Sequence, residues 1–71
     1  MDNLKIEQYK LLLMEYLVEH HKITAPQAQL IIAKSTINKM LKSSPEFTMH
    51  YSIEDNADEI WNEYLGIPIE M

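Results

Sequence analysis

The segment TAPQAQLIIAKSTINKMLKSS, residues 24–44, decides the fold that this sequence predicts. Thr24 is a good N-cap, and Pro26 suits the first turn of a helix, where a missing N–H costs nothing. We therefore expect a helix over residues 24–33. A serine–threonine pair then caps a second helix over residues 36–43, whose apolar side chains have the spacing of a buried stripe.

The rest of the chain adds two helices and a strand to this pair. Residues 4–21 contain no Pro or Gly and are rich in helix formers, which predicts a long first helix. Residues 47–53 alternate apolar and polar side chains, which predicts one short strand. Asn56 has the character of an N-cap and Gly66 that of a helix terminator, so residues 57–65 are expected to form a last, acidic helix.

The length of 71 residues indicates a single domain with one small core. Chains of this size bury only about 60% of the surface of the unfolded chain, which makes help from a partner plausible. We expect residues 1–71 to form one mainly α domain of four helices with one short β element.

Charge is divided unevenly along the chain, although the net charge is −5. Residues 20–45 contain four lysines and no carboxylate, whereas residues 46–71 contain seven carboxylates and no lysine or arginine. An acidic protein does not attract nucleic acid as a whole, so any contact with DNA must come from the local basic block.

The run Ser-Thr-Ile-Asn-Lys-Met-Leu, residues 35–41, is similar to recognition helices that begin Ser-Thr-Ile or Ser-Thr-Val. Over residues 9–53 the chain resembles the helix-turn-helix and winged-helix domains of bacterial and phage regulators. This resemblance implies a small transcriptional regulator that binds double-stranded DNA as a homodimer. It places six residues toward DNA: Lys34, Ser35, Thr36, Asn38, Lys39 and Lys42. Asn can pair with adenine, and Lys supplies charge toward phosphate.

A second hypothesis is a protein-interaction module, similar to phage inhibitors or antitoxins, that binds a partner protein through its acidic or apolar surface. The first helix carries a surplus apolar stripe, and the acidic helix carries the only tryptophan. We expect a dimer or partner interface at Leu11, Met14, Val18 and Trp61.

Other classes of function lack sequence support. The chain has no Gly-rich nucleophile elbow, no Cys nucleophile and no phosphate loop, so we do not expect an enzyme. Glu19, His20, His21 and His50 lack the spacing of zinc ligands, and we expect neither a metal site nor a cofactor. Charged residues interrupt every apolar run, which argues against a membrane span and predicts a soluble cytoplasmic protein.

Overall fold

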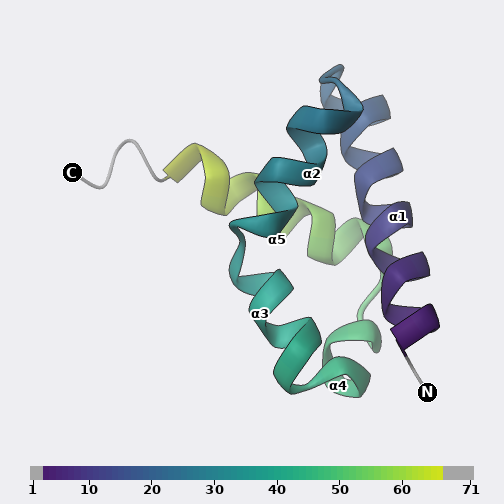
Figure 1. Ribbon diagram of the computed structural model, residues 1–71. Coiled ribbons are helices and arrows are strands. Elements are labelled where there is room, and N and C mark those ends of the chain that lie inside the picture. Colours follow the sequence, from purple (N-terminus) through teal and green to yellow (C-terminus); the bar gives the residue numbers. More distant parts are fainter. Residues whose placement is uncertain (1–2, 67–71) are drawn as a thin grey trace.

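Five α-helices form the described part of the chain, residues 3–66 of the computed structural model (Figure 1). In chain order they are α1 (Asn3–His21), α2 (Ala25–Ala33), α3 (Thr36–Ser43), α4 (Pro45–Met49) and α5 (Ile53–Gly66). The expectation of a mainly α protein is confirmed, but residues 3–66 contain no strand. None of these five helices is both long and apolar enough to cross a membrane.

The helices pack around α1 and α5. α1 runs beside α2, and α5 packs against α1, α2 and α3, passing behind α2 in the view of Figure 1. The short helix α4 contacts α3 at the opposite end of the molecule from the α1–α2 link. As a result, one face of the domain is built by α3, α4 and the first half of α5.

Local signals fix the starts of α2 and α3, and the first three helices lie close to where the sequence predicts them. At α2, the N–H of Gln27 donates to Thr24 Oγ1 over 3.2 Å, and the N–H of Thr24 donates to Gln27 Oε1 over 3.1 Å. This is a capping box, and it needs only residues that are close in the chain. At α3, Ser35 Oγ accepts from the N–H of Asn38 over 3.2 Å.

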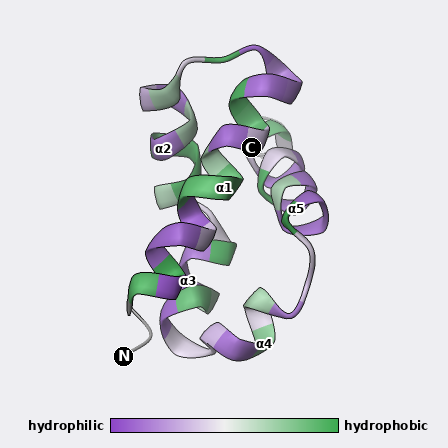
Figure 2. Ribbon diagram, turned by 90° about the vertical axis from the view of Figure 1, so that its right-hand side faces the viewer, coloured by the Kyte–Doolittle hydropathy of each residue, from purple (hydrophilic) through white to green (hydrophobic). Residues whose placement is uncertain are grey.

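The core contains nine buried apolar side chains that come from α1, α2, α3 and α5. Figure 2 shows that much of α5 is hydrophilic, whereas α1, at the front of this view, carries several hydrophobic segments. The buried set is Leu13, Leu17, Ala28, Ile31, Ile32, Ile37, Leu41, Ala57 and Ile60. From α4, Met49 is partly buried against this core, whereas Phe47 is 57% exposed.

The strand predicted for residues 47–53 is wrong. These residues form the end of α4, a turn and the first residue of α5. Pro45 suits the first position of a helix because its φ is already fixed, and Thr48 Oγ1 donates to the Ser44 carbonyl oxygen over 2.8 Å. A strand also needs a second strand to pair with, and the structure offers none between residues 3 and 66.

The last helix begins earlier than the predicted range of 57–65, because Ser52 rather than Asn56 stands at its start. Ser52 Oγ accepts from the N–H of Asp55 over 3.1 Å. Asn56 lies inside α5 and is buried, and its amide donates to Tyr9 Oη over 2.7 Å and to the Thr48 carbonyl oxygen over 2.9 Å. It therefore joins α5 to α1 and α4 instead of capping a helix.

Candidate partner-binding surface

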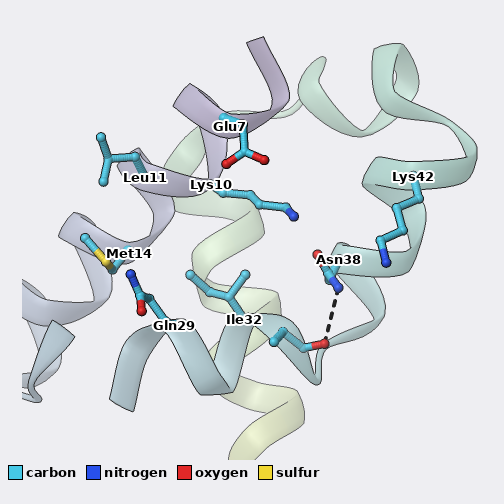
Figure 3. A pocket seen from close by; sticks show the side chains of 9 residues that line it. Glu7, Lys10, Leu11, Met14, Gln29, Ile32, Asn38 and Lys42 are labelled. Carbon is cyan, nitrogen blue, oxygen red and sulfur yellow. Dashed lines mark hydrogen bonds between the residues drawn. The ribbon is translucent and has the colours of Figure 1, made fainter. Parts of the chain in front are cut away.

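Three of the six residues predicted to face DNA use their polar groups inside the fold. Ser35 is only 3% exposed, and its Oγ donates to the Ile32 carbonyl oxygen over 2.6 Å while capping α3. The Asn38 amide donates to the Ala33 carbonyl oxygen over 3.2 Å (Figure 3). Both side chains thus stabilise the turn between α2 and α3. The fold itself therefore accounts for a serine and an asparagine at these two positions.

The third of these residues, Thr36, is bonded to a carboxylate of α5. Glu63 Oε1 accepts from the N–H of Thr36 over 2.9 Å, and Glu63 Oε2 accepts from Thr36 Oγ1 over 2.8 Å. The start of a helix attracts anions, because its first N–H groups have no partner within the helix. In this protein that place is filled by the chain's own carboxylate.

The three predicted lysines, Lys34, Lys39 and Lys42, are exposed. Lys42 of α3 and Lys10 of α1 line a groove of about 290 Å³ between α1, α2 and α3, and they face each other across it (Figure 3). Glu7 lies on the edge of the same groove and offsets part of this charge. The positive surface is therefore narrow, and sequence analysis did not identify Lys10 as part of it.

The first half of α5 presents an acidic face to solvent. Glu54, Asp55, Asp58 and Glu59 are all exposed, whereas the opposite side of the helix is buried in the core. Glu54 and Asp58, and likewise Asp55 and Glu59, are four residues apart, so the two adjacent pairs form a band along one side of the helix. These charges also act on α1. The pKa of Tyr16 is raised, first by desolvation and then by the negative charges of Asp58 and Glu54.

An apolar groove of about 550 Å³ lies between α3, α4 and this acidic face. Phe47 is 57% exposed and Tyr51 is 45% exposed, and their rings meet edge to face with centroids 5.6 Å apart and an interplanar angle of 88°. We call this site the acidic groove. Its lining residues are Ile37, Met40, Phe47, Tyr51, Asp55, Asn56, Asp58 and Glu59.

The four residues predicted for a dimer or partner interface do not form one surface. Met14, Val18 and Trp61 are partly buried and pack against the core. The Trp61 ring stacks on His21 with centroids 3.8 Å apart and an interplanar angle of 5°. Only Leu11 is exposed, at 50%. Met14 and Val18 of α1 are thus partly covered by this chain's own helices, whereas Leu11 and its neighbour Leu12 stay half-exposed.

Sequence analysis did not identify Phe47 and Tyr51 as partner-binding residues, because it placed both in a predicted strand. Pro45 was the available signal, since proline often opens a helix and would have put these two rings on one side of a turn. Among residues 3–66, no three His, Asp or Glu side chains are grouped so that they could hold a metal ion.

Comparison of the chain with protein-family models, curated proteins and solved structures finds no match. Function is therefore inferred from the surface alone.

Proposed function

We propose that this chain is a protein-interaction module that binds a partner protein through the acidic groove. The observation that carries the proposal is the pair Phe47 and Tyr51, two aromatic side chains about half exposed over an apolar floor. Aromatic side chains in pockets supply much of the binding energy of protein interfaces. Contiguous apolar surface on a small domain is costly in water, which favours a role in recognition.

Charge supports a protein partner over nucleic acid. The net charge is −5, and carboxylates border both the acidic groove and the start of α3. A phosphate approaching Thr36 would have to displace Glu63 and would meet like charge on the rest of α5. A protein partner has no such obstacle at Phe47.

A DNA-binding regulator with a helix-turn-helix fold, acting as a homodimer in the cytoplasm, is the second candidate. It is favoured by α2 and α3, which a two-residue turn joins, and by the exposed lysines Lys34, Lys39 and Lys42. Under this hypothesis the lysines bind phosphates, and removing one lysine–phosphate pair lowers the slope of log affinity against log salt concentration by about 0.9. Lys39→Ala and Lys42→Ala would then flatten that plot.

The test is selection of peptides from a displayed random library on the wild-type protein and on the double variant Phe47→Ser/Tyr51→Ser. Leu12→Ser is the matched control, because Leu12 is 50% exposed on α1 and lies outside the acidic groove. We expect peptides that bind the wild type and the control but not the double variant. Equal enrichment on all three proteins would reject the proposal.

Fluorescence anisotropy with a random duplex at low salt addresses the second candidate in the same preparation. Binding that the Lys39→Ala and Lys42→Ala variants weaken supports DNA recognition, whereas the absence of any binding rejects it. Melting curves recorded by circular dichroism show whether each variant is folded before either assay is interpreted.

A further inference from the structure

The chemistry of the acidic groove specifies its occupant, on the premise that the proposed function holds. We propose that the groove binds a basic amphipathic helix of a partner protein, in which Lys or Arg residues flank an apolar stripe. The inference rests on three features of the groove: its apolar floor, the spacing of its carboxylates and the absence of basic residues from its lining.

The floor fits an apolar stripe. Three apolar side chains line the groove: Ile37 is buried, Met40 is partly buried and Phe47 is exposed. Methionine is unbranched and flexible, so it adapts to the side chain that enters. The volume of about 550 Å³ lies within the range of roughly 300–1,000 Å³ that is usual for ligand pockets. An amphipathic helix places apolar side chains into such grooves at intervals of three or four residues.

The rim fits a basic helix. Asp55, Asp58 and Glu59 line the groove, and the described residues that line it include no lysine. Asp55 and Glu59 are four residues apart on α5, which corresponds to about 6 Å along the helix axis. A partner helix that lies beside α5 with Lys or Arg at positions i and i+4 has the same spacing. An Arg beside Tyr51 also gains attraction from the aromatic face.

Charge disfavours a second copy of this chain as the occupant. Each copy carries a net charge of −5, so bringing two together opposes like charge with like charge. A basic partner instead gains electrostatic steering toward the rim and keeps its register through the paired charges. Self-association through the groove is therefore the competing outcome of the experiment.

The experiment uses three labelled helical peptides that share one leucine stripe and differ only beside it, with Lys, Gln or Glu. Affinity for the full chain is measured by fluorescence anisotropy at low and high salt. We expect tightest binding of the Lys peptide and loss of this preference at high salt. Phe47→Ser/Tyr51→Ser should abolish binding of the Lys peptide, which separates docking in the groove from general attraction.

The matched charge variants are Asp55→Asn/Glu59→Gln in the rim and Glu15→Gln/Glu19→Gln on the exposed face of α1. Both remove two negative charges. We expect about a five- to tenfold loss of affinity for the Lys peptide with the rim variant, from two solvent-exposed ion pairs, and less than about twofold with the α1 variant. Equal losses would overturn the inference.

Two further results would overturn the inference and leave the proposed function standing. One is binding of the Gln or Glu peptide that is as tight as, or tighter than, binding of the Lys peptide, provided that Phe47→Ser/Tyr51→Ser still abolishes binding. The other is sedimentation velocity in which the wild type self-associates and the same double variant does not, since the groove would then bind a second copy. If the displayed library yields no peptide that depends on Phe47 and Tyr51, the proposed function itself is wrong.

Discussion

The carboxylate of Glu63 is expected to stabilise the fold by about 2 kcal/mol, because it satisfies two donors at the start of α3. Those donors are the N–H and the Oγ1 of Thr36, at 2.9 and 2.8 Å. A hydrogen bond contributes roughly 0.5–1.5 kcal/mol, and the lower half applies here because both bonds are open to solvent. A carboxylate at a helix N-terminus adds about 0.3–1 kcal/mol.

Glu63→Ala should therefore lower the free energy of unfolding by about 2 kcal/mol and the melting temperature by roughly 10 °C. Glu63→Gln keeps one acceptor and loses the charge, so about 1 kcal/mol is expected. Urea denaturation followed by circular dichroism measures both. The control is Glu59→Ala, which removes the same charge from an exposed site on the same helix and should cost less than about 0.5 kcal/mol. Equal effects of Glu63→Ala and Glu59→Ala would refute the reasoning.

The same pair of variants bears on DNA binding. If α3 contacts phosphate, Glu63→Ala frees two donors at the start of that helix and should raise affinity for duplex DNA more than Glu59→Ala does. If the lysines merely attract DNA through long-range charge, the two variants should raise affinity equally, because each removes one negative charge.

Three other predictions concern Asn56, Tyr9 and Lys22. Asn56→Ala removes two hydrogen bonds that join α5 to Tyr9 and Thr48 and should cost about 2–3 kcal/mol in urea denaturation; a cost below about 0.5 kcal/mol would contradict this role. The pKa of Tyr9 is raised, first by burial, so the folded state favours the neutral phenol. The contribution of this pKa shift to the free energy of unfolding is complete below about pH 10 and is lost as pH rises through the folded-state pKa. Tyr9→Phe should therefore flatten the decline in stability at alkaline pH, measured by urea titrations at a series of pH values. Lys22 has φ of 55°, a left-handed conformation, so Lys22→Gly should raise stability by up to about 1 kcal/mol, whereas Lys34→Gly at φ of −93° should not.

Sequence reasoning succeeded where the deciding interactions are local. α2 starts after Thr24 because a residue three positions later completes its cap, and α3 starts after Ser35 for the same kind of reason. It failed at residues 47–53, because a short alternation of apolar and polar side chains also fits a helix turn followed by a loop. Whether such a segment pairs as a strand depends on a distant partner, which no local pattern shows.

The candidate site shows the same limit. The exposure of Lys39 and Lys42 follows from the polar face of α3, which the sequence displays. The bonding of Thr36 to Glu63 does not, because it depends on where α5 crosses α3, and Glu63 is 27 residues away in the chain. The acidic groove is harder still to foresee, since three helices contribute to it.

The division of charge along the sequence acquires a different meaning once α5 lies against α3. The acidic segment is not a separate tail: its helix supplies both the rim of the acidic groove and the carboxylate at Thr36. A helix is about 10–12 Å across, and the Debye length in physiological salt is about 8 Å, so exposed charges on opposite sides of α3 are largely screened from each other. The rim therefore repels a phosphate near Lys39 appreciably only at low salt, whereas a basic helix in the groove meets the same carboxylates at contact distance.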